Sequence, residues 1–392
     1  MKSKVSIVVP VYNGEKTLSL CLDSLMNLDF PRDDLEIIVV DNNSTDTTKD
    51  IISRYPVKYV FERKKGRGAA RNKGITESKG ELVAFIDVDC VADRLWLMNI
   101  VKGFRDETVG GSGGEVFSLN PHTLIEKYYD FKDLFSQKRG LMGMELPLPR
   151  IATFNAIYRR DVLEEVGLFD DSFITNEDAD LSWRVYLKGY QLKYVPEAIV
   201  YHKHPSRLID FFRKWFEYGY TCTYLLQKYT NLIEMPLVSC NDCIVFFFQQ
   251  LHSLGLLPIT LFTGRDIVGR TFPILDTIKD VASFLGRFYG LARLRLGKEK
   301  IAPLPILESK VLWRIVDEKV IISEPNRYFH YALNNVGSKV WTLYIEGKDV
   351  SKIIDIIADE YEADKEEVKN DLINFIDELK NESLLPAGKL KT

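Results

Sequence analysis

The sequence lacks the cysteine pattern of a disulfide-bonded protein. Its five cysteines are an odd number in 392 residues, and only Cys240 and Cys243 are close neighbours. No second pair completes a zinc site with them, so we interpret them as free thiols in a reducing compartment. Residues 1–4 lead directly into an apolar segment, without the pattern of a secretory signal. We therefore expect a cytoplasmic protein.

A strong excess of either charge is also absent. The 52 Lys and Arg residues nearly balance the 56 Asp and Glu residues, which leaves a net charge of -4 and no general attraction for nucleic acid. We therefore expect no nucleic-acid partner. Neither G-x-G-x-x-G after the first apolar segment nor G-x-x-x-x-G-K-[ST] occurs, which argues against a dinucleotide-binding fold and a P-loop NTPase. The length suits two or three domains.

One segment, from Cys243 to Thr263, has no formal charge. Its length approaches that of a membrane-spanning helix, but its glutamines, histidine, glycine and proline disfavour a true span. Two interpretations remain: a segment that lies in the membrane interface, or a buried helical hairpin. The amphipathic residues 284–290 are followed by four basic residues up to Lys300. Such a basic end suits peripheral contact with the inner face of the cell membrane.

The N-terminal half alternates strand-like and helix-like segments. The strand-like segments are residues 5–9, 35–40, 58–61 and 82–86, and the segments between them with helical character are 15–28, 45–55 and 68–78. Continuous apolar strands that alternate with helices predict a parallel sheet covered on both faces. Ligands bind such sheets beyond the carboxyl ends of the strands. Three of these ends carry polar clusters, at residues 12–13, 41–44 and 87–89.

The last cluster, Asp87-Val88-Asp89, has the composition of a cation site. Carboxylates two residues apart in an extended segment point to the same side, and hard cations prefer such oxygen ligands. Taken alone, the pair also fits a solvated strand end. A phosphatase of the haloacid dehalogenase type is another interpretation, but its D-x-D motif normally ends the first strand. Here the pair ends the fourth strand and is followed by Cys90.

Together these segments resemble the family 2 glycosyltransferases of the GT-A fold. The resemblance extends from residue 5 to about residue 220. It implies an α/β fold with a Rossmann-like mixed, mostly parallel sheet. It also implies inverting transfer from a nucleotide sugar, usually a UDP-sugar. The matching motifs are Val8–Asn13, Val39–Asp46, Gly68–Gly74, Phe85–Asp89, Gly167–Asp170 and Asn176–Arg184.

The resemblance implies a role for individual residues on the donor side. Asp41 would accept a hydrogen bond from the base, although residues 41–46 also have the composition of a turn with a helix cap. Arg71 and Asn72 would lie near the diphosphate, and Asn155 would approach the donor sugar. The residues that would line the nucleotide pocket are Pro10, Tyr12 and Asn13.

The resemblance also implies a metal ion, Mn²⁺ or Mg²⁺, and a catalytic base. Asp89 would bind the metal directly, and Asp87 would hold the ribose or reach the metal through water. His202 is a candidate third ligand. Asp178, with Glu177 before it, is the candidate base, although acidic residues at a helix start also complement the helix dipole.

A second module follows a proline-containing linker at residues 301–306. Short strands are expected at 311–316, 319–323 and 328–333, followed by three helices up to residue 382. This module resembles a PqqD-type winged-helix domain, a small α+β fold. The resemblance implies that a leader peptide adds as a strand to the sheet edge at residues 327–333. A regulatory or dimerisation domain is the alternative.

These observations predict three units: a catalytic domain at 1–228, a helical linker region at 229–305 and the C-terminal domain at 309–388. One hypothesis is an inverting, metal-dependent glycosyltransferase that modifies a ribosomally made peptide. Another is a membrane-associated glycosyltransferase that acts on a lipid or glycan, with a regulatory C-terminal domain. The third is a non-catalytic nucleotide-sugar or peptide-binding scaffold, which the intact acid pair and candidate base disfavour.

Overall fold

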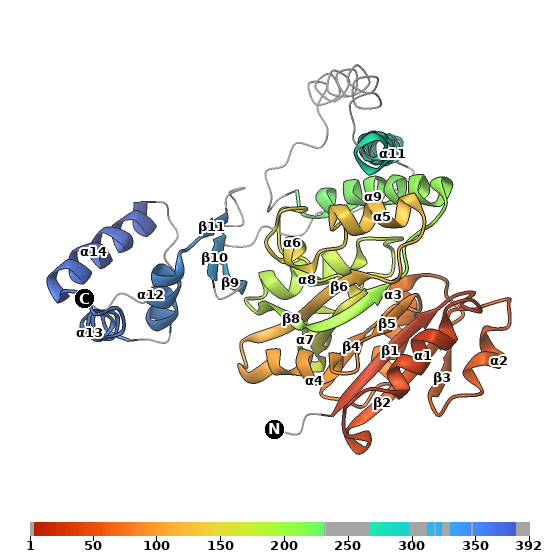
Figure 1. Cartoon of the computed structure of the whole chain (residues 1–392), viewed down its shortest axis with the longest axis horizontal. Coiled ribbons are helices and arrows are strands. Elements are labelled where there is room, and N and C mark those ends of the chain that lie inside the picture. Colours follow the sequence, from red (N-terminus) through yellow and green to blue (C-terminus); the bar gives the residue numbers. More distant parts are fainter. Residues whose placement is uncertain are drawn as a thin grey trace.

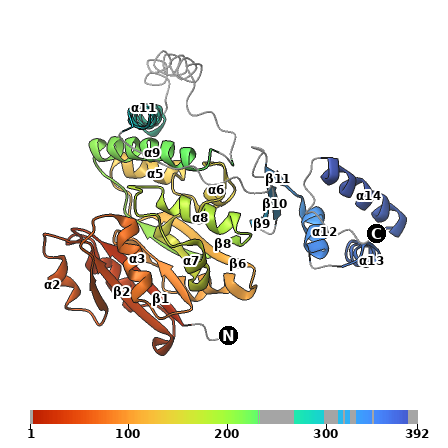
Figure 2. The ribbon, with the colours of Figure 1, turned by 180° about the vertical axis from the view of Figure 1, so that it is seen from behind.

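The structure is a computed structural model of the whole chain (Figures 1 and 2). It describes residues 4–230, 232, 267–297, 312–316, 319–323, 330–345 and 348–381. The uncharged segment 243–263, the linker 301–306 and part of the predicted edge 327–333 lie outside the described residues. Within the described part, no helix combines the length and apolar character that crossing a membrane requires.

The N-terminal part contains most of the elements that the apolar pattern predicts. The strands are β1 (Val5–Val11), β2 (Leu35–Asp41), β3 (Lys58–Phe61), β4 (Leu82–Phe85), β5 (Cys90–Ala92), β6 (Val109–Ser118), β7 (Ala156–Arg159) and β8 (Gln191–His202). The helices are α1 (Leu18–Met26), α2 (Thr48–Ile52), α3 (Arg67–Glu77), α4 (Trp96–Ile100), α5 (Leu124–Lys132), α6 (Gln137–Leu141), α7 (Arg160–Val166), α8 (Glu177–Leu187), α9 (Leu208–Lys228) and α11 (Ile267–Arg295). Short 3₁₀ turns occupy Arg32–Asp34, Val101–Arg105 and Thr153–Asn155.

The eight strands form one mixed sheet in the order β3-β2-β1-β4-β7-β6-β8-β5. Strands β1 to β4 are mutually parallel where they pair, and β8 runs parallel to β6. Strand β7 runs antiparallel to both of its neighbours, and β5 antiparallel to β8. The expected α/β class with a mixed, mostly parallel sheet is therefore confirmed.

Helices cover both faces of this sheet, and each face has its own apolar core. Side chains from α1, α2, α4, α5 and α11 pack against one face, side chains from α3, α6, α7 and α8 pack against the other, and α9 contributes to both cores. Burial on both faces explains why β1, β2 and β4 are continuous apolar runs rather than alternating ones. It also leaves the carboxyl ends of these strands as the open edge of the layer.

Helix α2 is shorter than the expected segment 45–55. It begins only at Thr48 because the preceding residues are held in a loop by side-chain hydrogen bonds. Asp46 Oδ1 accepts a bond of 3.0 Å from the backbone nitrogen of Thr48, while Asp46 Oδ2 accepts one of 3.1 Å from the nitrogen of Glu15. Local hydrogen bonds of this kind compete with helix formation. The loop therefore belongs to the sheet edge and not to the helix.

Helices α9 and α11 lie side by side above the sheet (Figure 1). Their backbones approach closely at two glycines. A Cβ atom on Gly286 would lie 2.0 Å from the carbonyl oxygen of Phe216, and one on Gly219 would lie 2.0 Å from the carbonyl oxygen of Ser283. Only glycine allows such an approach, so these two positions fix how α11 crosses α9.

The C-terminal module has the expected α+β composition. It contains β9 (Leu312–Val316), β10 (Lys319–Ser323) and β11 (His330–Ala332), then α12 (Asn335–Ile345), α13 (Val350–Tyr361) and α14 (Lys365–Asn381). The strands form an antiparallel sheet in the order β11-β10-β9, so β11 is a terminal strand of the described sheet. At the other side of this sheet, β9 lies beside β8 of the large sheet (Figure 1).

Candidate active site

Two polar loops meet where β1 and β2 end. The side-chain oxygen of Asn13 accepts a hydrogen bond of 2.8 Å from the nitrogen of Thr45, and the nitrogen of Asn13 donates one of 2.9 Å to Ser44 Oγ. Asp41 is buried, and its Oδ1 accepts a bond of 2.9 Å from the nitrogen of Ser44. Tyr59 OH donates to Asp41 Oδ2 over 3.3 Å. The parallel register thus brings the first two predicted clusters together.

Tyr12 projects from this edge and is 49% exposed. The ammonium group of Lys65 lies 4.9 Å from the centre of its ring, and Lys65 Nζ is 3.3 Å from Tyr12 OH. Pro10, the third residue predicted in this pocket, lies within β1 and is half-buried. The phenol ring of Tyr12 therefore offers an accessible aromatic face beside a cation at the end of β1.

Asn42 fixes the basic loop that precedes α3. Its Nδ2 donates hydrogen bonds to the carbonyl oxygens of Glu62 and Lys64, at 3.2 and 2.7 Å, and its Oδ1 accepts one of 2.8 Å from the nitrogen of Gly66. Gly66 has φ 139°, a conformation that favours glycine. The loop between β3 and α3 is thereby held against the end of β2.

Arg71 joins two parts of the site that are distant in sequence. Its Nη2 donates to Asp87 Oδ1 over 2.8 Å, and its Nη1 to Glu177 Oε1 over 2.5 Å. The Arg71 and Glu177 side chains are 2% and 4% exposed. Burial alone would raise the pKa of Asp87, but the charges of Arg71, Arg67 and His202, with the hydrogen bond from Arg71, together hold that pKa below its usual range. The end of β4 and the start of α8 are therefore coupled through one buried cation.

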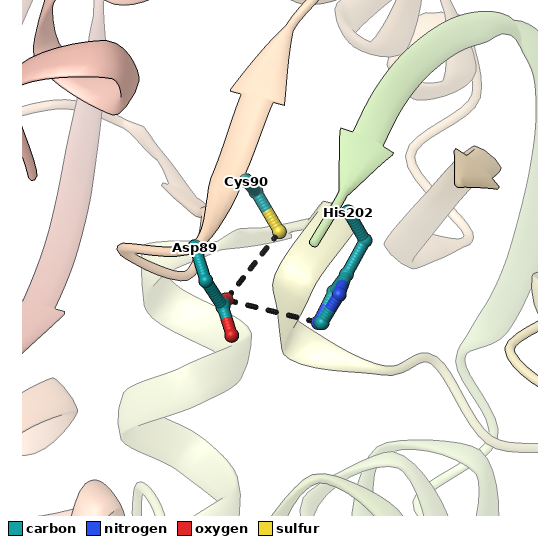
Figure 3. Close-up of side chains that lie close together, drawn as sticks. All are labelled: Asp89, Cys90 and His202. Atoms are coloured by element: carbon teal, nitrogen blue, oxygen red, sulfur yellow. Dashed lines mark hydrogen bonds and ion pairs between the residues drawn. The ribbon is translucent and has the colours of Figure 1, made fainter. Parts of the chain in front are cut away.

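Asp89, Cys90 and His202 form a second cluster beside this one (Figure 3). Asp89 Oδ1 lies 3.7 Å from His202 Nε2 and 3.9 Å from Cys90 Sγ. The Asp89 side chain is 40% exposed, whereas that of His202 is 3% exposed. The predicted metal ligands Asp89 and His202 are thus neighbours, although 113 positions separate them in the sequence. Oxygen and imidazole nitrogen are both donors that Mn²⁺ accepts, so this pair fits a divalent cation.

Asp178 and Glu177 differ in access although they are consecutive. Glu177 is enclosed with Arg71, whereas the Asp178 side chain is 15% exposed. Arg150 Nη1 lies 3.8 Å from Asp178 Oδ2, and Asp178 Oδ1 accepts a hydrogen bond of 2.8 Å from the nitrogen of Ala179. Of the carboxylate oxygens of Glu177 and Asp178, Asp178 Oδ2 is therefore the one that remains accessible at the start of α8.

A cavity of about 260 Å³ adjoins Asp178 through Arg150, Asn176 and Tyr218. Aromatic residues Phe135, Trp215 and Tyr218 supply part of its wall. Four cationic residues line it against one carboxylate, that of Glu145; they are Arg139, Arg150, Lys279 and Arg287. The cavity is bounded by α9 and α11, which are fixed to each other by Gly219 and Gly286. The cavity can accept a group that carries a negative charge and also has an aromatic or apolar part.

Two predicted donor-side residues have other roles in the structure. Asn155 is completely buried; it accepts a hydrogen bond from Trp96 Nε1 at 2.8 Å and donates to the carbonyl oxygens of Glu115 and Ala198, at 2.8 and 2.9 Å. The expectation that Asn155 contacts the donor sugar is therefore corrected, because its amide is fully used inside the protein.

Asn72 has a structural contact as well. Its Nδ2 donates to the carbonyl oxygen of Phe169 over 2.8 Å, and its Oδ1 accepts from the nitrogen of the same residue over 2.9 Å. This reciprocal pair binds α3 to the loop after α7 and uses one N–H group and the oxygen of the Asn72 amide. Arg71, also expected at the diphosphate, is enclosed between Asp87 and Glu177.

Arg67 and Tyr218 are site residues that the sequence patterns did not single out. Burial alone would lower the pKa of Arg67. The charges of Glu177, Tyr218 and Asp87 nevertheless raise this pKa above its usual value. Arg67 is one helical turn before Arg71 on α3, so the i, i+4 spacing provides a signal that was available in the sequence. Tyr218 lies on α9, and its position depends on how this helix crosses the sheet.

Comparisons with known proteins agree with this geometry. The sequence pattern of the family described as "Glycosyl transferase family 2" matches residues 6–167. "Glycosyltransferase AglE" of Haloferax volcanii is 31% identical over 224 residues, which cover 55% of this chain and 71% of that protein. The chain belongs to glycosyl transferase family 2. A second family pattern, "Coenzyme PQQ synthesis protein D (PqqD)", matches residues 318–385, which confirms the expected resemblance of the C-terminal module.

Two further relatives extend the comparison. "Probable glycosyltransferase YdaM" of Bacillus subtilis is 31% identical over 216 residues, which cover 52% of this chain and 51% of that protein. "Pre-mycofactocin glycosyltransferase" of Mycobacterium tuberculosis is 28% identical over 305 residues, which cover 74% of this chain and 63% of that protein. The chain thus spans about half of the Bacillus relative and less than two thirds of the mycobacterial one.

Proposed function

We propose that this family 2 member is a glycosyltransferase that moves a sugar from a nucleoside diphosphate to an acceptor with inversion of configuration. The observation that carries the proposal is the double contact of Arg71, with Asp87 at 2.8 Å and Glu177 at 2.5 Å. It holds the acid pair at the end of β4 next to the helix start that bears Asp178. A donor-binding edge and a candidate base are thereby joined in one rigid arrangement.

The nucleotide would bind at the ends of β1 and β2. Asp41 Oδ1 and Oδ2 are acceptors suited to the N–H group of a uracil base, and the exposed ring of Tyr12 offers a stacking surface beside it. Arg67, on the first turn of α3, and Lys65 are cations near the expected path of the diphosphate. A UDP-sugar is therefore the donor that we propose.

Asp89 and His202 would hold a divalent cation, Mn²⁺ or Mg²⁺, which would neutralise charge on the departing diphosphate. Two observations support the fit. Among the described residues, His202 Nδ1 is buried without a hydrogen-bond partner, and the other ring nitrogen faces Asp89. Arg71 contacts Asp87 through Oδ1, so Asp87 Oδ2 would serve the ribose or a metal-bound water.

The acceptor would bind in the cavity between α9, α11 and Arg150. Asp178 Oδ2 would take the proton of the acceptor group while that group attacks the anomeric carbon of the sugar. The bond from this carbon to the diphosphate oxygen breaks, and its electron pair leaves with the nucleoside diphosphate. Attack from the side opposite the leaving group inverts the configuration. Arg150 Nη1, 3.8 Å from Asp178 Oδ2, would help to hold this carboxylate in position before transfer.

The acceptor that we propose is a ribosomally made peptide whose leader binds the C-terminal domain. The PqqD match to residues 318–385 and the mycobacterial relative's name, which refers to pre-mycofactocin, support this choice. The terminal strand β11 would receive the leader as an added strand. The units would be the catalytic domain 1–228, the helical region 229–305 and the peptide-binding domain 309–388.

The test is hydrolysis and transfer from a panel of UDP-sugars, with and without Mn²⁺, followed by mass spectrometry. We expect Asp178→Asn to bind UDP normally but to lose at least roughly a hundredfold in turnover. Asp161→Asn is the matched control, because Asp161 lies in the first turn of α7 and its Oδ1 also accepts a 2.8 Å bond from the next backbone nitrogen. Near-full turnover in Asp178→Asn would exclude this residue as the base, and no turnover of any donor by the unmodified chain would contradict the enzyme proposal.

A further inference from the structure

The strand pairing places a sulfur atom in the proposed cation site. Cys90 and His202 are direct partners in the antiparallel ladder between β5 and β8. Side chains that are directly opposite in such a ladder lie on the same face of the sheet. Asp89 immediately precedes β5, and its carboxylate turns toward both partners (Figure 3). The donor atoms of the three side chains all lie within 4.8 Å of one another.

The spacing of these donors is close to that of a metal-bound set. Oxygen, nitrogen and sulfur ligands around a tetrahedral zinc ion lie about 3.4–3.6 Å from each other, given bonds of about 2.0–2.3 Å. Asp89 Oδ1 is 3.7 Å from His202 Nε2 and 3.9 Å from Cys90 Sγ. A small rotation of the partly exposed Asp89 side chain would bring its oxygen to that spacing from the other two donors.

The environment of His202 points to a ligand. Its side chain is 3% exposed, and within the described residues Nδ1 has no hydrogen-bond partner. Its Nε2 faces a carboxylate at 3.7 Å, beyond hydrogen-bond distance. Nε2 is therefore directed at the Asp89 carboxylate without a hydrogen bond to it, and a cation between the two groups would be bound by both.

We propose that Cys90 Sγ is a third protein ligand of this site, so that Asp89, Cys90 and His202 bind borderline or soft divalent ions such as Zn²⁺, Co²⁺ and Cd²⁺. The inference rests on the proposed function only in that both use the same cation site. Binding breaks the S–H bond, forms a sulfur–metal bond and releases the proton to solvent, without oxidation or reduction. Three protein ligands leave at least one position open, which is the pattern of catalytic rather than structural zinc sites.

The chemical consequence is a preference among metals. Oxygen ligands alone favour Mg²⁺ and Mn²⁺, whereas a thiolate and an imidazole favour zinc and its heavier analogue cadmium. Mg²⁺ would use Asp89 and leave the thiol of Cys90 protonated. Zn²⁺ and Cd²⁺ would therefore bind more tightly than Mg²⁺ and Mn²⁺, and would displace them at equal concentration.

The experiment uses the full chain with Cys240→Ser and Cys243→Ser, which removes the one closely spaced cysteine pair in the sequence. Titration with Cd²⁺ should produce an ultraviolet thiolate-to-metal charge-transfer band that saturates at one ion per chain. Co²⁺ should give the corresponding visible and near-ultraviolet bands. Absence of a charge-transfer band with both metals would overturn the inference, whatever the enzyme activity.

Variants then identify the sulfur. Cys90→Ser should abolish the band and lower the affinity for Cd²⁺ by at least roughly tenfold, while the affinity for Mg²⁺ changes little. Cys21→Ser is the matched control, because Cys21 is also a buried thiol near Asp87 but lies outside the donor set. His202→Gln should weaken Cd²⁺ binding yet keep the band. A band that persists in Cys90→Ser, or that only Cys21→Ser removes, would contradict the proposal.

The two proposals fail separately. Transfer from a UDP-sugar with Mn²⁺ but no thiolate band would leave the proposed function intact and remove Cys90 as a ligand. A thiolate band without sugar transfer from any donor would support Cys90 as a ligand and contradict the proposed function. If Cys90→Ser does not fold, Cys21→Ser and His202→Gln decide the question, because the band should persist in Cys21→Ser and need more Cd²⁺ in His202→Gln.

Discussion

Arg71 Nη1 and Glu177 Oε1 lie 2.5 Å apart in a part of the protein from which water is almost excluded, and 106 positions separate them in the chain. The pair ties α3 to the start of α8, and the second guanidinium nitrogen of Arg71 extends the link to Asp87. Removal of either partner would leave the other as an unpaired buried charge, which is strongly destabilising.

Replacement of Arg71 by leucine is therefore expected to lower the free energy of unfolding by about 3–5 kcal/mol, since it leaves the Glu177 carboxylate buried without its partner. Chemical denaturation of the full chain measures this. Lys73→Leu on the same helix is the control, because Lys73 is a partly exposed residue paired with Glu77, and it should change stability far less. The double variant Arg71→Leu, Glu177→Leu should recover much of the stability but not activity. Equal losses in Arg71→Leu and Lys73→Leu would contradict the buried link.

Asn155→Ala tests whether the buried amide is a packing group. We expect a loss of about 2–4 kcal/mol in the free energy of unfolding, because Trp96 Nε1 and two carbonyl oxygens lose their partner. The affinity for the UDP-sugar donor, measured by calorimetry, should stay within about twofold of that of the unmodified chain, since a change below about 0.4 kcal/mol is expected at a site the side chain does not touch. Unchanged stability together with weakened donor binding would instead restore Asn155 to the donor site.

The edge of β11 allows a test that separates backbone from side chain. The nitrogen of Leu333 donates to the carbonyl oxygen of Val320 on β10 over 2.8 Å, so by alternation the backbone N–H of Ala332 points away from β10. Ala332→Pro removes this outward donor and keeps the ladder to β10. We expect it to weaken capture of the cognate leader peptide by roughly tenfold, measured by fluorescence anisotropy with the full chain.

Ala332→Val is the matched control for this edge, because it enlarges the side chain and keeps the backbone donor. Its affinity for the peptide should remain close to that of the unmodified chain. Equal binding by the proline and valine variants would show that the leader does not add as a strand at β11. Loss of binding in both would point to the side chain and not to the backbone.

The close contact between α9 and α11 predicts that a substitution that usually stabilises a helix destabilises this protein. Gly→Ala in a helix normally adds up to about 1 kcal/mol of stability. At Gly286 the added Cβ would lie 2.0 Å from the carbonyl oxygen of Phe216, so we expect Gly286→Ala to destabilise by about 1–3 kcal/mol as the helices separate. Thermal and chemical denaturation measure the change. A stabilised Gly286→Ala variant would mean that the two helices do not approach as closely.

Local patterns predicted the strands and helices well where burial alone decides them. The apolar runs in residues 5–9 and 82–86 correspond to β1 and β4, because strands covered on both faces exclude polar residues. The same logic brought the ends of β1 and β2 to one edge. Asp89 and His202 were paired by resemblance to a family and not by any pattern, since nothing local indicates that β5 and β8 are neighbours.

The failures concern side chains whose partners are distant. Asn155 and Asn72 have the residue type and location of binding groups, yet their amides are used by Trp96 and by the backbone of Phe169. Arg71 was expected at the diphosphate but is enclosed with two carboxylates. The chain positions of such partners carry no periodic signal, so polar residues in a sequence cannot be sorted into those that bind ligands and those that hold the fold together.

The three-stranded sheet has one side next to β8, while β11 forms its other edge. A strand added there would lie about 14 Å from β9, three strand spacings away. A leader held in this way becomes a fixed anchor, and the residues after it become a tether of about 3.3 Å each. The position that receives the sugar would then be chosen by the length of the tether rather than by the residues around it. Adding or removing residues in the tether would therefore shift the modified position along the peptide.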